Sequence, residues 1–78
     1  MTDWYQIAGN VLRAELARQG LSYRQLAALL AGIGVDETER AIANKLSRGS
    51  FSFAFFLQCM RALGRNDFRI DLTDFPKR

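Results

Sequence analysis

The stretch Ser22–Leu30, which reads SYRQLAALL, is the clearest local signal in the chain. Ser22 and Gln25 form a capping box, in which each side chain satisfies a free backbone N–H of the other residue at the start of a helix. Gly32 and Gly34 follow, and glycines at this position favour the end of the helix. The residues in between repeat at helical spacing and predict its buried face: Leu26, Ala27, Leu29 and Leu30. The sequence therefore predicts a short helix that begins after Ser22.

The residues before this stretch predict a longer helix near residues 3–19. Thr2 is expected to cap its start, and Gly20 is expected to end it in the left-handed conformation. The apolar residues of this segment lie three and four positions apart, on one face of the helix: Trp4, Ile7, Ala8, Val11, Leu12 and Leu16.

A third helix is predicted from Asp36 to Gly49. Asp36 and Glu39 form a box-like pair of acids, which suits the positive end of a helix. On a helical wheel one side carries Ile42, Ala43 and Leu46, and the other side carries Glu37, Ala41, Asn44 and Arg48.

A fourth helix is predicted from its cap at Ser52 to about Leu63, with Gly64 ending it. Phe51 before the cap and Phe56 inside the helix have the spacing of a hydrophobic staple. The apolar surface of this helix is unusually broad: Phe53, Phe55, Phe56, Leu57, Cys59, Met60 and Leu63. Either the helix is central in the bundle, or part of it faces a second chain.

Residues 65–78 have a different pattern from the helical bundle of residues 1–64. Phe68, Ile70 and Leu72 alternate with polar residues, which predicts either a short strand or an extended tail. Because a lone strand is not stable, the strand alternative requires a partner, such as the same segment of a second chain. The expected fold class is all-α, with an extended or β C-terminal segment.

Composition excludes several functions. With 78 residues the chain is about half of the ~150 expected for one domain, which leaves room for a single small domain. Without histidine, and with Cys59 as its one cysteine, it has no disulfide and no zinc site, so we expect no cofactor, no metal and no enzymatic activity. Cys59 is expected to be a core thiol. No apolar run approaches the ~18 residues of a membrane span, and no signal peptide is recognisable, which predicts a cytoplasmic protein.

Positive charge and the outward face of the third helix favour nucleic-acid binding. The formal net charge is +3 and the pI is about 9.6. Asn44 and Arg48 are residue types that read adenine and guanine edges, and Ala41 is small enough to let a helix approach bases. Arg40 and Lys45 add charge for phosphate contacts. At the start of the second helix, free N–H groups and polar side chains predict a phosphate site at Tyr23, Arg24 and Gln25.

From Val11 to Gly64 the chain resembles the lambda-repressor-like (XRE-type) helix-turn-helix domains. The matching stretches are Leu21–Ala27, Ala43–Gly49 and Arg61–Gly64. The runs Lys45–Ser52 and Phe55–Gln58 are also similar to a small bacterial family described as a domain of unknown function.

The helix-turn-helix resemblance implies a role for each matching position. Gln25 would contact the DNA backbone, Ser50 would contact a phosphate from the loop, and the groove-facing positions would be Ala41, Asn44 and Arg48. The chain departs from the pattern in its longer turn between the second and third helices, and in Glu37, which places an acid on the predicted reading face.

Two hypotheses follow. The first is a small DNA-binding transcriptional regulator that acts as a homodimer on a two-fold site. The second is a protein-interaction module that keeps the helical scaffold without DNA binding. The predicted contact residues for the partner chain are Phe53, Leu57, Phe68, Ile70 and Leu72.

Overall fold

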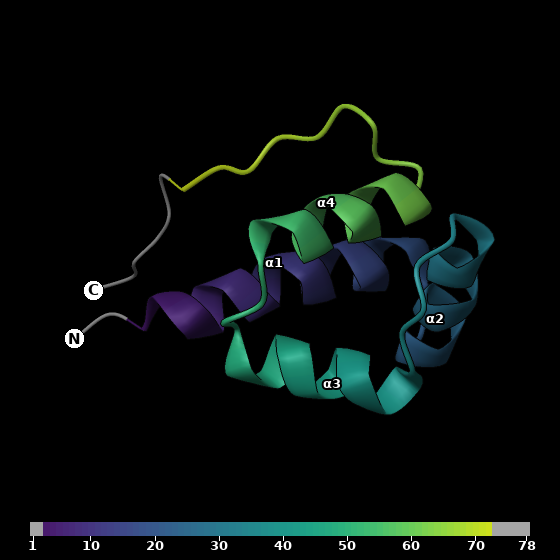
Figure 1. The fold of residues 1–78 in the computed structure, drawn as a ribbon. Coiled ribbons are helices and arrows are strands. Elements are labelled where there is room, and N and C mark those ends of the chain that lie inside the picture. Colours follow the sequence, from purple (N-terminus) through teal and green to yellow (C-terminus); the bar gives the residue numbers. More distant parts are fainter. Residues whose placement is uncertain (1–2, 73–78) are drawn as a thin grey trace.

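The computed structural model describes residues 3–72, which form four helices (Figure 1). The fold is all-α, as predicted, and residues 3–72 contain no strand. The predicted cap Thr2 and the end of the tail, residues 73–78, lie outside the described residues. The helices are α1 (Trp4–Gln19), α2 (Tyr23–Gly32), α3 (Glu39–Arg48) and α4 (Phe53–Ala62).

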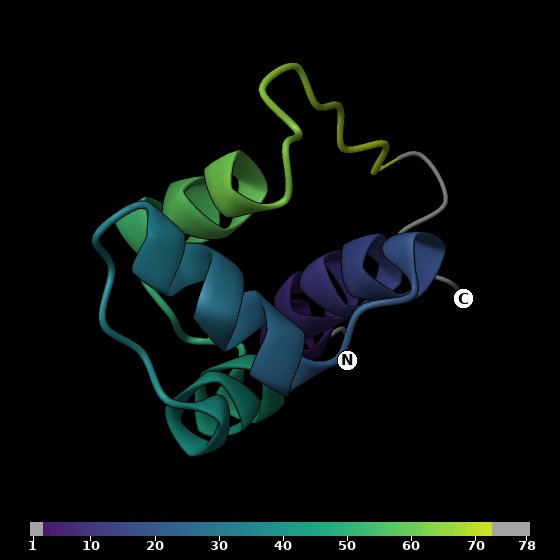
Figure 2. The same ribbon diagram turned by 90° about the vertical axis from the view of Figure 1, so that its right-hand side faces the viewer.

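The helices pack around one core, with α3 and α4 on opposite sides of the molecule (Figures 1 and 2). The long helix α1 packs against α3, and α2 contacts both α3 and α4. Each helix contributes leucine, isoleucine or aromatic side chains to the core, whose fully buried members are Leu12, Leu26, Leu30, Ile42, Leu46 and Cys59. Burial of these apolar groups is the main stabilising term for the bundle.

Two glycines allow α1 to approach α3 closely. A Cβ atom added at Gly9 would lie 2.3 Å from the backbone oxygen of Leu46. One added at Gly49 would lie 1.8 Å from the backbone oxygen of Tyr5, and Gly49 also has a left-handed backbone with φ of 70°. Larger residues at either position would push α1 and the end of α3 apart.

Most of the predicted helix ends are confirmed. Ser22 Oγ accepts from the Gln25 backbone N–H at 3.1 Å and Gln25 Oε1 accepts from the Ser22 N–H at 2.8 Å, which completes the capping box. Ser52 caps α4, and Gly20 ends α1 in the left-handed conformation. At the start of α1 the prediction is wrong: Asp3, not Thr2, accepts from the backbone N–H of Gln6. The helix begins at Trp4, so Asp3 occupies the N-cap position, three residues before the Gln6 N–H that its carboxylate accepts from.

The predicted start of α3 is also wrong. Thr38, not Asp36, is the N-cap, and its hydroxyl accepts from the Ala41 backbone N–H at 3.0 Å. Glu37 therefore precedes the helix, and its carboxylate accepts from the Lys45 ammonium group at 2.5 Å. In a continuous helix these two residues would be about 12 Å apart along the axis, so the contact requires Glu37 to lie outside α3.

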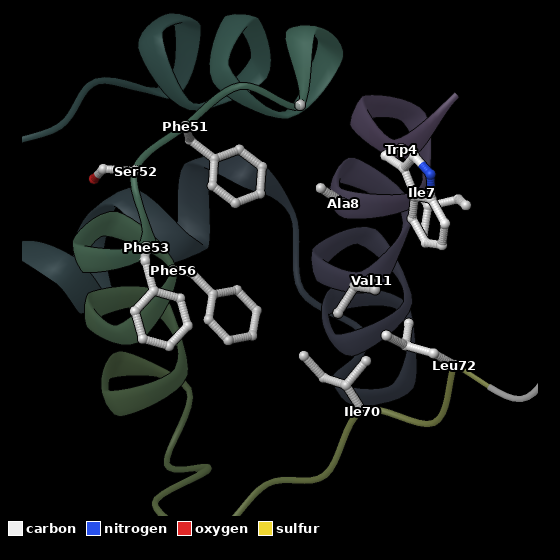
Figure 3. Close-up of a pocket in the computed structure, with 11 residues that line it drawn as sticks. Trp4, Ile7, Ala8, Val11, Phe51, Ser52, Phe53, Phe56, Ile70 and Leu72 are labelled. Carbon is white, nitrogen blue, oxygen red and sulfur yellow. The ribbon is translucent and has the colours of Figure 1, made fainter. Parts of the chain in front are cut away.

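The chain after α4 takes the extended alternative and not the strand. Phe68 packs edge-to-face on Phe56, with ring centroids 5.3 Å apart, so the tail begins by closing over the core. Ile70 and Leu72 continue beside α1 (Figure 3). No neighbouring strand is available to residues 68–72 in this part of the chain, so their backbone stays without regular structure.

Phe51 makes a ring contact with Phe55, at 5.7 Å and an interplanar angle of 62°. The predicted staple partner Phe56, one residue further along, instead has ring contacts with Phe53 and Phe68. The ring contacts around the start of α4 therefore form two groups, Phe51 with Phe55, and Phe56 with Phe53 and Phe68.

Candidate nucleic-acid interface

The outward face of α3 presents polar and basic side chains to solvent. Arg40, Asn44 and Arg48 are all exposed and share one side of the helix, opposite the buried Ile42 and Leu46. Ser47 is exposed on the same side, although the sequence analysis did not include it among the contact residues. Ala41, at the edge of this face, is half-buried. A helix with long cationic and amide side chains on one open face can enter a major groove and contact base edges.

Glu37 and Lys45 lie on the flank of this face and form an ion pair. The Lys45 ammonium group lies 2.5 Å from the Glu37 carboxylate and 4.6 Å from the centroid of the Phe55 ring. The half-buried Lys45 is thus engaged by an acid and by an aromatic face. Glu37, which the sequence predicted to lie on the same face as Asn44, therefore does not lie on the outward face of α3. Its carboxylate largely neutralises the charge of Lys45.

The start of α2 lies beside the start of α3. Both views show the first turns of the two helices at the same lower end of the molecule (Figures 1 and 2). Arg24 and Gln25 are exposed there, while Tyr23 is half-buried and packs against the core. The Gln25 side-chain oxygen is occupied by the capping box, which leaves its amide N–H groups to face outward.

Three arginines supply unneutralised charge on this side of the molecule. Arg24, Arg40 and Arg48 are exposed, and no carboxylate lies within ion-pair distance of them in residues 3–72. Ser50, the predicted loop contact, is exposed just after Gly49 at the far end of α3. The α2–α3 face, defined here as Arg24, Gln25, Arg40, Asn44, Ser47, Arg48 and Ser50, thus combines most of the predicted DNA contacts.

The predicted partner-contact residues lie elsewhere. Phe53 and Leu57 are exposed on α4, and Ile70 and Leu72 are exposed in the tail. Phe68 is half-buried because its ring packs on Phe56. These side chains are on the α4 side of the molecule, away from α3.

One polar cluster was missed by the sequence analysis. Glu15 is 4% exposed, and both its carboxylate oxygens accept from Arg65 Nη1, at 3.0 and 2.9 Å. Arg18 also donates to Glu15. The available signal was the position of Glu15 on the same side of the helical wheel as Leu12, where a buried acid requires a cationic partner. This cluster fastens the residues after α4 to α1.

The described residues offer no metal site and no activated nucleophile. Residues 3–72 contain no group of three or more metal-ligating side chains. Cys59 is fully buried, as predicted, and burial, with a smaller contribution from Glu37, raises the pKa of its thiol from 9.0 to about 12, against a lowering effect of Lys45. A thiol in this state is protonated at neutral pH and is a poor nucleophile. None of the helices in residues 3–72 has the length and apolar character needed to cross a membrane.

These features define a small four-helix domain with a polar, basic α2–α3 face and an apolar α4 side. The chain belongs to a family described as a domain of unknown function (DUF6471), whose model matches residues 4–68. The match spans all four helices and ends at Phe68, where the tail begins to cover the core. No curated protein and no solved structure matches the chain.

Proposed function

We propose that this protein binds double-stranded DNA as a small transcriptional regulator of the helix-turn-helix type, similar to the lambda-repressor-like domains, and that it is not an enzyme. The observation that carries the proposal is the open face of α3, where Arg40, Asn44 and Arg48 are exposed and no ion pair within residues 3–72 engages either arginine. In this proposal α3 enters the major groove, and Asn44 and Arg48 contact base edges.

The start of α2 supports the same orientation on DNA. Its free backbone N–H groups, the exposed Arg24 and the outward amide of Gln25 form a site suited to a backbone phosphate. Because the starts of α2 and α3 lie side by side, one duplex can contact both (Figures 1 and 2). Ser50 would contact a phosphate at the other end of α3.

The corrected start of α3 favours this proposal. Since Glu37 precedes the helix and pairs with Lys45, the reading face carries no acid beyond Glu39 in the first turn. The same pairing assigns Lys45 a structural role, so the arginine contacts to phosphate fall to Arg24 and Arg40. With few phosphate contacts per chain, one copy binds weakly and two copies on a two-fold site bind usefully.

The test is fluorescence anisotropy with random-sequence duplex DNA at two salt concentrations. We expect binding at low salt that weakens steeply as salt rises, because each phosphate contact adds about 0.9 to the slope of log K against log salt. Arg40→Ala should lower the affinity and reduce that slope by about 1, because Arg40 is assigned a phosphate contact. The matched control is Arg61→Ala, which removes an exposed arginine from α4 on the opposite side of the molecule. Absence of binding at low salt, or equal effects of the two variants, would refute the proposal.

The second candidate is a protein-interaction module on the same scaffold. Exposed Phe53 and Leu57, one turn apart on α4, favour it because large apolar side chains rarely gather on a surface without a partner. A chain that fails to bind DNA but forms a stable complex through α4 would belong to this class.

A further inference from the structure

Arg13 of α1 reaches across to the last turn of α3. Its Nη2 donates to the backbone oxygen of Leu46 at 3.0 Å, and its Nη1 donates to Oδ1 of Asn10 at 2.7 Å. The side chain is half-buried, and no carboxylate of residues 3–72 lies within ion-pair distance of it. Arg13 is therefore bound by two neutral oxygens, one of which belongs to another helix.

The Leu46 oxygen is one of the carbonyl groups that the end of α3 leaves without a helical partner. The last backbone hydrogen bond of this helix runs from the Gly49 N–H to the Lys45 oxygen, at 2.9 Å. The carbonyl groups that follow Lys45 must find other donors. A guanidinium group suits this position, because its hydrogen bond is charge-assisted and the C-terminal end of a helix favours positive charge.

Gly9 keeps the path between Arg13 and Leu46 open. A Cβ atom at Gly9, one turn before Arg13, would lie 2.3 Å from the Leu46 oxygen and 3.2 Å from Arg13 Nη1. A side chain at this position would therefore compete with the guanidinium group for the same space. The close approach of α1 to α3 and the hydrogen bond of Arg13 depend on the same glycine.

We propose that Arg13 is a positioning residue for DNA reading, which orients α3 so that Asn44 and Arg48 meet base edges. The side chain of Leu46 is buried in the core, and its carbonyl group is bound by Arg13. Two attachments at one residue fix both the depth and the rotation of the last turn of α3. Asn44 and Arg48 each lie two positions from Leu46, so their placement follows from its placement. Contacts of this kind require placement to within about 0.5 Å.

Arg13 also lies beside the start of α2. It lines a surface hollow together with Leu21, Ser22 and Tyr23. The guanidinium group is thus next to both parts of the α2–α3 face, the reading helix and the phosphate site. This inference rests on the proposed function and deepens it, because it assigns the relative placement of these two parts to one side chain.

The test compares selectivity, which is the ratio of the dissociation constants for random-sequence duplex DNA and for a site selected by the wild-type chain. Arg13→Gln should lower this ratio about tenfold, the effect of one mismatched base pair. The matched control is Arg61→Gln, which removes the same charge from an exposed position on α4 and should leave the ratio unchanged. The affinity for random-sequence DNA and its salt slope should be the same in the two variants, because a positioning residue does not contact phosphate.

Asn10→Ala is the second variant, since it removes the group that orients Arg13 and leaves the net charge unchanged. It should lower the ratio in the same direction by a smaller factor. Urea unfolding of each variant gives the folded fraction, by which the dissociation constants are corrected. A variant whose only defect is instability would keep the wild-type ratio after this correction.

The wild-type ratio in both Arg13→Gln and Asn10→Ala would overturn the proposal. A salt slope in Arg13→Gln that is lower by about 1 than in Arg61→Gln would also overturn it, because Arg13 would then contact a phosphate directly. A wild-type chain that binds no DNA would refute the proposed function and this inference together. A wild-type chain that selects a site, with variants that select it equally well, would refute this inference alone.

Discussion

Arg65 donates through Nη1 to both carboxylate oxygens of Glu15, at 3.0 and 2.9 Å, across 50 residues of sequence. The carboxylate is almost fully buried, and the guanidinium is about one third exposed. A buried acid of this kind is costly without its cation, so the pair ties the chain after α4 to the middle of α1.

Arg65→Ala is therefore expected to lower the free energy of unfolding by about 1–3 kcal/mol, because Glu15 keeps only Arg18 as a partner. Urea unfolding measures this loss. Arg61→Ala, in which the lost arginine is exposed and has no ion pair in residues 3–72, should change stability by less than about 0.5 kcal/mol. Equal losses in the two variants would mean that the pair contributes nothing to stability.

Gly49→Ala and Gly20→Ala form a second matched pair. Both glycines have a left-handed backbone, with φ of 70° and 67°, so both variants pay about 1–2 kcal/mol of backbone strain. Only at Gly49 does the new Cβ meet the backbone of Tyr5, whereas the space around Gly20 is open. We expect Gly49→Ala to cost about 3 kcal/mol more than Gly20→Ala in thermal or urea unfolding. Similar losses would show that the backbones of Tyr5 and Gly49 separate easily.

Asn44→Ala tests base reading once a specific DNA site has been selected from random sequence. The expected loss is about 1–3 kcal/mol of binding free energy, with relaxed preference at one base pair, since an asparagine amide pairs with one adenine edge. Asn66→Ala removes the same exposed side chain from the loop after α4 and should not change the affinity. If site selection with Asn44→Ala returns the wild-type preference, Asn44 does not read a base.

Glu37→Gln tests the ion pair between Glu37 and Lys45 on the flank of α3. Loss of the carboxylate frees the Lys45 ammonium group, so the affinity for random-sequence DNA should rise and the salt slope should steepen by about 1. Asp67→Asn, with the same change in net charge far from α3, should have a smaller effect. Adding Lys45→Met to Glu37→Gln restores the wild-type net charge and should abolish the gain, and a gain that survives this change would not come from the freed Lys45 ammonium group. An equal gain in Asp67→Asn would assign the effect to net charge alone.

Cys59 predicts a loss of stability at alkaline pH. Its thiol has a pKa of about 12 in the folded chain and an ordinary value of 9.0 when unfolded, so only the unfolded chain loses this proton between those two values. The contribution of this thiol to the free energy of unfolding is fully present below pH 9, and above pH 9 it falls by about 1.4 kcal/mol per pH unit. Urea unfolding at several pH values measures this slope, which should flatten in Cys59→Ala. An unchanged slope in that variant would assign the alkaline loss to other groups.

The sequence predicts most of the bundle because its strongest signals are local. The capping box at Ser22 and Gln25 and the glycine ends at Gly20 and Gly49 depend on neighbouring residues only. Signals that depend on distant partners were misread or missed. Asp36 and Thr38 are both good caps, and the choice between them involves the contact of Glu37 with Lys45.

The candidate sites follow the same rule. The outward face of α3 could be predicted, because a helical wheel separates Asn44 and Arg48 from Ile42 and Leu46. The groove between α1 and the start of α4, lined by Trp4, Val11, Phe53 and Phe56 among others, could not be predicted from the sequence. Its width depends on the distance between the two helices and on the path of the tail. The partner of Glu15 was equally hidden, since Arg65 lies 50 positions away.

The close approach of Gly49 to Tyr5 restricts how the length of the chain can vary within the family. An extra residue between α3 and α4 would have to be accommodated where two backbones already touch, so we expect relatives to keep this connection at one length. The connection between α2 and α3 is different, because Gly34 is exposed with open space around it. Insertions and deletions should therefore collect around Gly34, where they alter the approach to α3 without disturbing its far end.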